Sequence, residues 1–135
     1  AIDITADGEK LYKKSRSHKN NWKGMFTSHQ SMFFRNNKIE YSLNYPLTAD
    51  YAFISQNLSH LKEENILKLD FAVCKFKLGG TNEKYRYRAL VEDFQIRKNI
   101  MKLSIMKSSV LFLMHFFHTV LKRNVPFLTR KLRYK

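Results

Sequence analysis

The period of the hydrophobic pattern changes along this chain, and that change most constrains its fold. Apolar residues recur at helical spacing across positions 49–61, at Tyr51, Phe53, Ile54, Leu58 and Leu61. They then alternate with polar residues across 66–78, as in a half-buried strand. The first five residues also alternate, and Asp7-Gly8 supplies a turn before Leu11-Tyr12, which predicts a hairpin. Strands interspersed with helices predict an α/β fold.

The remaining predicted elements are one buried strand and three helices, at 25–35, 49–61, about 83–99 and about 102–123. The strand carries His29 and Gln30 at its start, and Thr48 is the expected N-cap of the first helix. This layout brings a strand end, a helix start and a single carboxylate, Asp50, to one point. Clefts of open α/β folds are commonly built in this way.

The charge balance limits the partners of this chain. Its formal net charge is +14 over 135 residues, and 44% of the residues are hydrophobic, enough for the core of one domain or part of one. Such a field favours anionic partners, namely nucleic acid, phospholipid headgroups or phosphorylated substrates. One group of cations forms either a rim that attracts phosphates or a solvated loop: Lys13, Lys14, Arg16, His18, Lys19 and Lys23.

Residues 101–135 form a second unit, an apolar helix followed by a basic tail. No charged residue stands between Lys107 and Lys122, and no acidic residue follows Asp93. The apolar run is shorter than the about 20 residues that span a bilayer. Two interpretations stay open: a helix that lies in the headgroup layer with its cations on anionic lipid, or a buried core helix with a solvated tail.

Asp50 has the setting of a general base. In the first turn of a helix, the macrodipole and the free backbone N–H groups favour the charged carboxylate. A carboxylate in a cleft can accept the proton of a hydroxyl as that hydroxyl attacks an electrophile. Because no nucleophilic partner accompanies it, direct displacement fits better than a covalent intermediate. The alternative is that Asp50 only caps its helix or meets a surface cation.

Two motifs stand in a fixed order, Ser-His-Gln-Ser-Met-Phe-Phe-Arg at 28–35 and Ala-Asp-Tyr-Ala-Phe at 49–53. Together they resemble the family 2 glycosyltransferases of bacterial surface-polysaccharide synthesis, which carry a His-Gln-Ser/Ala strand followed by an Ala-Asp-Tyr-Asp-Phe-like motif. The hairpin and basic loop at 7–23, the Gly-Gly turn that closes 75–80 and the helix at 92–97 look like further parts of that family. The resemblance covers most of residues 1–100.

The resemblance implies the C-terminal part of a nucleotide-diphospho-sugar transferase (GT-A) fold, a short mixed sheet with flanking helices. It implies that Asp50 is the catalytic base, which deprotonates an acceptor hydroxyl as that oxygen attacks the anomeric carbon with inversion. His29 and Gln30 would line the cleft near the donor phosphates or the acceptor, and Arg16 and Tyr51 would complete the substrate-binding set. The expected acceptor is a carbohydrate or a lipid-linked sugar, and the expected location is the cytoplasmic face of the cell membrane.

The chain departs from this family at two points. Ala52 stands where the family often has a second Asp. The sequence also contains no Asp-x-Asp motif, which in the family holds Mn²⁺ or Mg²⁺ against the diphosphate. Residues 1–100 therefore look like the acceptor-side part of an enzyme that is inactive without its nucleotide-binding half. No metal ligand or cofactor is expected in this chain, and Mn²⁺ or Mg²⁺ is expected in the intact enzyme.

Three alternatives remain. Glu92-Asp93-Phe94 resembles the Glu-Asp base motif of related transferases; otherwise Glu92 lies near Arg97 on a solvated helix face. The segment 85–88 interleaves tyrosines with arginines, which is compatible with a small basic nucleic-acid-binding module. A peripheral membrane scaffold built around the C-terminal helix is the third.

Overall fold

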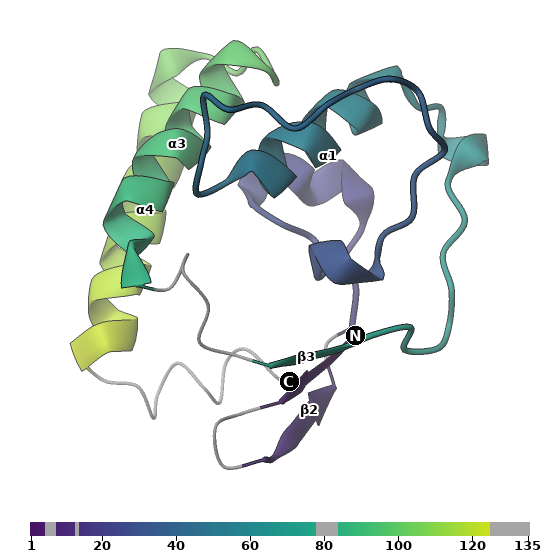
Figure 1. Ribbon diagram of the computed structural model, residues 1–135. Helices are drawn as coiled ribbons and strands as arrows, with labels where there is room; N and C mark the ends of the chain where they lie inside the picture. Colours follow the sequence, from purple (N-terminus) through teal and green to yellow (C-terminus); the bar gives the residue numbers. More distant parts are fainter. Residues whose placement is uncertain (5–7, 13, 78–83, 125–135) are drawn as a thin grey trace.

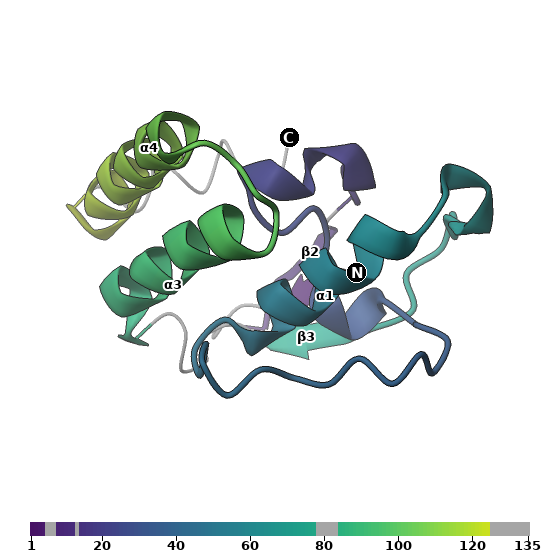
Figure 2. The ribbon, with the colours of Figure 1, turned by 90° about the horizontal axis from the view of Figure 1, so that it is seen from above.

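The computed structural model describes residues 1–4, 8–12, 14–77 and 84–124. Two long helices, α3 (Arg86–Asn99) and α4 (Ile105–Asn124), lie side by side in both Figure 1 and Figure 2. A shorter helix, α1 (Ala49–His60), packs beside α3, and a small sheet lies below it in Figure 1. The chain is therefore mixed α/β, as predicted. No helix within these ranges has the length and apolar character required to cross a bilayer.

The sheet has three short strands in the order β2-β1-β3. The outer strand β2 (Lys10–Tyr12) runs antiparallel to β1 (Ile2–Ile4), which confirms the predicted hairpin. Within its turn, Gly8 has a φ of 85°, a conformation that glycine adopts without strain. On the other side, β3 (Lys75–Lys77) runs parallel to β1, a pairing that requires the long intervening crossover.

The predicted strand at 66–78 is wrong for most of its length. Only β3 pairs with another strand, and the residues before it are irregular apart from a 3₁₀ turn, η3, at Glu63–Asn65. Leu67 is 84% exposed. The reason is the length of β1, which offers only three residues for pairing, so the rest of the alternating run has no neighbour. The predicted Gly-Gly turn at 79–80 and the basic tail after 124 lie outside the described residues.

The predicted buried strand at 25–35 is also wrong. His29–Ser31 forms a single 3₁₀ turn, η2, and the flanking residues are irregular. The Ser31 hydroxyl donates a 2.7 Å hydrogen bond to the Ser28 carbonyl, and the Ser31 amide donates to the same oxygen at 3.0 Å. Such local side-chain bonds offer the backbone an alternative to a sheet. Phe33 is 80% exposed, so this part of the apolar run does not enter the core.

The helices agree more closely with the sequence pattern. α1 has the predicted start, and Thr48 is its N-cap residue, although its hydroxyl makes no capping bond within the helix. α4 begins three residues later than predicted because Lys102 has a φ of 55°, which a helix cannot contain. Ser104 then caps the helix, since its hydroxyl accepts the amide N–H of Lys107 at 3.3 Å.

The core forms where α1 meets α3. Its buried cluster consists of Tyr45, Tyr51, Ala52 and Ile96, with Met25, Ile100 and Met101 packed around it. α4 covers the other side of α3 through aromatic pairs. Phe94 meets Phe112 edge to face, and the Tyr87 and Phe116 ring centres lie 5.6 Å apart. Packing of this kind fixes α3 between the two other helices.

Within the basic loop, the 3₁₀ segment η1 (His18–Lys23) contacts α4. His115 of α4 lies 2.8 Å from the Lys23 carbonyl oxygen through its Nε2 atom. The Trp22 ring is contacted by the ammonium groups of Lys23 and Lys107, whose Nζ atoms lie 5.0 and 4.1 Å from its centre. The His115 and Lys107 contacts tie α4 to the N-terminal part of the chain.

Candidate functional site

The two sequence motifs meet in one ion pair. His29 Nδ1 lies 2.7 Å from Asp50 Oδ2, which joins the η2 turn to the first turn of α1. The side chains are 42% and 23% exposed, respectively, so the pair lies at the surface and is open to solvent. The His29 Nδ1–H group donates to the Asp50 carboxylate. Because this carboxylate is partly exposed, an incoming hydroxyl can still reach it.

The other Asp50 oxygen serves its own helix. Oδ1 accepts the backbone N–H of Tyr51 at 2.8 Å. The free N–H groups and the dipole of the first turn favour a negative charge here. One oxygen is thus fixed to the backbone, and the other is oriented by an imidazole. Asp50 therefore caps its own helix and is also a candidate base, so the two interpretations of the sequence are compatible.

Helix α1 is capped from a distance by Glu92 of α3. The Glu92 Oε2 atom accepts the amide N–H groups of Leu47 and Thr48, both at 2.9 Å, and the Thr48 hydroxyl at 3.0 Å. Glu92 is buried, so this single oxygen satisfies three donors away from water. The expectation of a solvated helix face at Glu92 and Arg97 is wrong, because both side chains are buried. Glu92 fixes the chain that enters α1.

Asp93 and two arginines continue this buried polar face of α3. Asp93 lies 3.8 Å from Arg86 Nη1. Burial raises the pKa of the Asp93 carboxyl to about 6, although Arg86 and Arg97 oppose the shift, and Asp50 adds to it. Asp93 is 8% exposed and cannot receive a proton from a bulky substrate. The resemblance of Glu92-Asp93 to a base motif is therefore explained by structural roles.

Arg97 lies deepest in this face. Its Nε–H donates to the Trp22 carbonyl at 3.0 Å, and its guanidinium lies 5.7 Å from the centre of the Tyr51 ring. The Tyr51 hydroxyl in turn donates to the Asn21 carbonyl at 2.7 Å. Burial raises the pKa of the Tyr51 hydroxyl above its usual range, opposed by Arg97. These contacts hold η1 against α1 and α3.

The other predicted substrate-binding residues do not gather in one place. Gln30 is exposed beside His29 in η2. Arg16 is exposed as well, and its Nη2 donates to the Met25 carbonyl at 2.7 Å. Tyr51 is only 2% exposed because it packs in the core. We therefore withdraw it from the substrate-binding set. Of the predicted set, only His29 contacts Asp50.

Two hollows lie away from this pair. One, of about 320 Å³, is lined by Asn44, Pro46, Arg88, Val91, Glu92 and Gln95 and includes neither His29 nor Asp50. The other lies on α4. No group of three or more His, Cys, Asp or Glu side chains suited to a metal ion occurs among the described residues.

The buried acid-base pattern of α3 was missed in the sequence, where hydrophobic periodicity carries no signal for polar residues that face inward. The only trace is the concentration of charge in α3 at the expense of apolar residues: Arg86, Arg88, Glu92, Asp93, Arg97 and Lys98.

Comparison of the chain with protein-family models, curated proteins and solved structures gave no match.

Proposed function

We propose that this chain is the acceptor-side part of an inverting glycosyltransferase of polysaccharide biosynthesis, with a GT-A fold completed by a nucleotide-binding half. Such an enzyme transfers a sugar from a nucleotide-diphospho-sugar to a carbohydrate or lipid-linked acceptor. The observation that carries the proposal is the 2.7 Å contact between His29 Nδ1 and Asp50 Oδ2. It joins one residue from each of the two motifs that resemble this family, at a point that solvent reaches.

The proposed reaction needs one base. Asp50 accepts the proton of the acceptor hydroxyl, and the acceptor oxygen forms a bond to the anomeric carbon of the donor. The bond between that carbon and the diphosphate oxygen breaks, and the nucleoside diphosphate leaves with the electron pair. Attack from the face opposite to the leaving group inverts the anomeric configuration. His29 holds the carboxylate oxygen through its Nδ1–H group.

Two buried contacts support this role by making the base rigid. Glu92 fixes the residues that lead into α1, and the Tyr51 amide fixes one Asp50 oxygen. A base held within a narrow range of positions loses less freedom as the acceptor binds. In this proposal Glu92 is a positioning residue that acts through the helix start and does not touch the substrate.

No residue of this chain is assigned to a metal. The sequence has no Asp-x-Asp, and the described residues contain no cluster of metal-ligating side chains. Mn²⁺ or Mg²⁺, expected in the intact enzyme, would bind in the nucleotide-binding half and neutralise charge on the leaving diphosphate. No step derived for Asp50, His29 or Glu92 depends on it.

Internal contacts argue against the nucleic-acid-binding alternative. Arg86 pairs with Asp93, while Tyr87 packs on Phe116 and lies under the Arg123 guanidinium. A stacking platform requires aromatic faces that are open along one groove. Tyr87 is instead used between α3 and α4, and Arg86 is paired within α3, so neither side chain contributes to such a platform.

The test is an Asp50→Asn substitution in the intact enzyme. The amide keeps the shape of the side chain but cannot accept the proton, so kcat should fall by about 10²–10⁴-fold with donor affinity unchanged. Asp70→Asn, at an exposed bend, is the matched control. Equal transfer rates in the two variants would exclude Asp50 as the base.

A further inference from the structure

One face of α4 is apolar and unoccupied by any described residue. Its exposed side chains follow helical spacing over about 22 Å, at 1.5 Å per residue. We name this set the α4 stripe: Met106, Val110, Leu113, Met114, Phe117 and Leu121. Met106 is 78% exposed and Phe117 is 65% exposed. Contiguous exposed apolar surface of this kind marks an interaction site.

The opposite face of α4 is buried against the rest of the protein. Ser108, Leu111 and Thr119 are buried, and Phe112 and Phe116 meet aromatic rings of α3. Packing on α3 therefore settles which side of the helix faces the protein. The core interpretation of the sequence is therefore confirmed for one face, while the other face lies outside the core and leaves the headgroup interpretation a prediction.

Cations flank the α4 stripe at both ends. Lys102 precedes it, Lys107 follows Met106 at its N-terminal end, and Lys122 and Arg123 follow Leu121. No acidic residue occurs after Asp93 in the whole sequence. An apolar strip between two cationic ends matches the layered chemistry of an anionic phospholipid surface, with acyl chains below charged headgroups.

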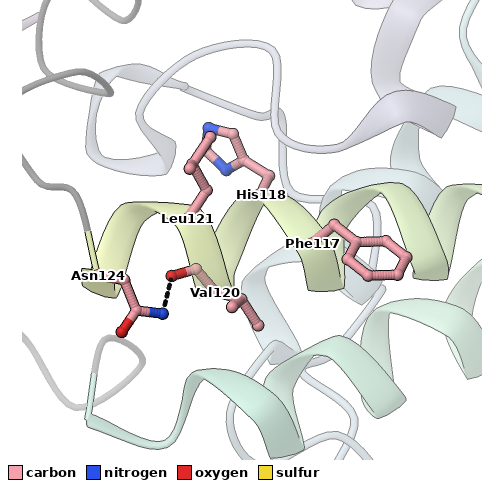
Figure 3. A pocket seen from close by; sticks show the side chains of 5 residues that line it. All are labelled: Phe117, His118, Val120, Leu121 and Asn124. Carbon is pink, nitrogen blue, oxygen red and sulfur yellow. Dashed lines mark hydrogen bonds between the residues drawn. The ribbon is translucent and has the colours of Figure 1, made fainter.

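A shallow hollow gives the α4 stripe depth near its C-terminal end. Its volume is about 500 Å³, and the residues of α4 that line it are Phe117, His118, Val120, Leu121 and Asn124. Figure 3 shows Phe117, Val120 and Asn124 on one side of the helix, with the Asn124 amide turned back onto the Val120 carbonyl at 2.9 Å. That bond removes a polar donor from an otherwise apolar surface.

We infer that the α4 stripe docks on an anionic phospholipid membrane, with the helix in the plane of the headgroups. Apolar side chains enter the boundary of the acyl region, and the flanking cations pair with lipid phosphates. A second copy of the chain is a poorer occupant, because two copies that meet through this face bring together two molecules of net charge +14. The inference is independent of the proposed sugar transfer.

The experiment is co-flotation of the full chain with vesicles of phosphatidylcholine alone or with about a third of phosphatidylglycerol, a composition chosen for its negative surface potential. Leu113→Glu/Phe117→Glu should weaken binding to the anionic vesicles by at least about tenfold, because two membrane-inserted side chains become charged. The matched control is Leu43→Glu/Leu67→Glu, which changes two exposed leucines elsewhere by the same charge. Circular dichroism of each variant checks that it is folded.

The outcomes are distinct. Binding that requires phosphatidylglycerol, falls with salt and is lost only in the α4 variant supports the inference. Equal loss in both variants, or equal retention, overturns it, because the α4 stripe is then irrelevant. If the chain forms dimers without lipid that the α4 variant breaks, and no vesicle recovers it, the occupant is a second copy and the inference is wrong. None of these measurements depends on Asp50.

Discussion

A single oxygen of Glu92 accepts both the amide and the hydroxyl of Thr48, at 2.9 and 3.0 Å. The start of α1 is therefore held by a residue on α3, far away in the sequence. This contact controls where Asp50 lies, because Asp50 follows Thr48 in the first turn of the helix.

Glu92→Ala is expected to destabilise the chain by about 2–3 kcal/mol, because it removes the carboxylate that accepts the buried Thr48 hydroxyl and the Leu47 amide. Glu92→Gln keeps one acceptor oxygen and should cost about 1 kcal/mol. Urea unfolding followed by circular dichroism measures both. Glu40→Ala, at an exposed position, is the control, and equal stability of Glu92→Ala and this control would refute the capping role.

His29→Ala should lower the kcat of the intact enzyme by about tenfold or more while leaving KM nearly unchanged, because the substitution frees the Asp50 oxygen that His29 orients. His29→Asn supplies an N–H donor near the position of Nδ1 and should restore part of the loss. His60→Ala, at the exposed end of α1, is the matched control. No rescue by Asn would mean that orientation of Asp50 is not the function of His29.

Asp93 should make stability depend on pH between about 4 and 6. Its folded pKa, about 6, is raised above the ordinary 3.8, so in this window the folded state binds a proton that the unfolded state has lost. The free energy of unfolding should therefore fall as pH rises, by up to about 3 kcal/mol. Urea titrations at several pH values should show this slope in the wild type and a flatter one in Asp93→Asn. Parallel curves would contradict the assignment.

His115 should act in the opposite direction. Burial lowers the pKa of the His115 imidazole below 6.5, and Arg97 adds to the effect, against the hydrogen bond to Lys23. Below pH 6.5 the unfolded chain takes up a proton that the folded chain resists, so His115 contributes stability that is lost as pH falls. His115→Gln should retain more of its stability on acidification. A loss equal to that of the wild type would place the acid sensitivity elsewhere.

The sequence predicted helices better than strands, for a physical reason. The pattern at 49–61 defines one buried face and its cap, and both are local properties that the chain itself supplies. The alternating run at 66–78 needs a partner strand, and β1 offers only three residues. Likewise, the apolar run at 25–35 contains Ser31, whose hydroxyl bonds to the Ser28 carbonyl within the η2 turn.

The candidate site was predictable only in part. The motifs identified His29 and Asp50, and these two side chains do meet. Each stands near the start of its element. Glu92 was considered as a base or a solvated residue, and its capping role was missed because two of its three donors are backbone amides, which leave no mark in a sequence. Tyr51 was misplaced for a related reason. Its neighbour Asp50 faces solvent, so adjacent positions on α1 point to opposite environments, and only the packing of α3 decides between them.

Trp22 is the only tryptophan in the chain, and Lys107 at the start of α4 lies over its ring. A displacement of that ammonium group changes the electric field across the indole. The fluorescence emission wavelength of Trp22 in the unlabelled protein thus reports displacement of α4.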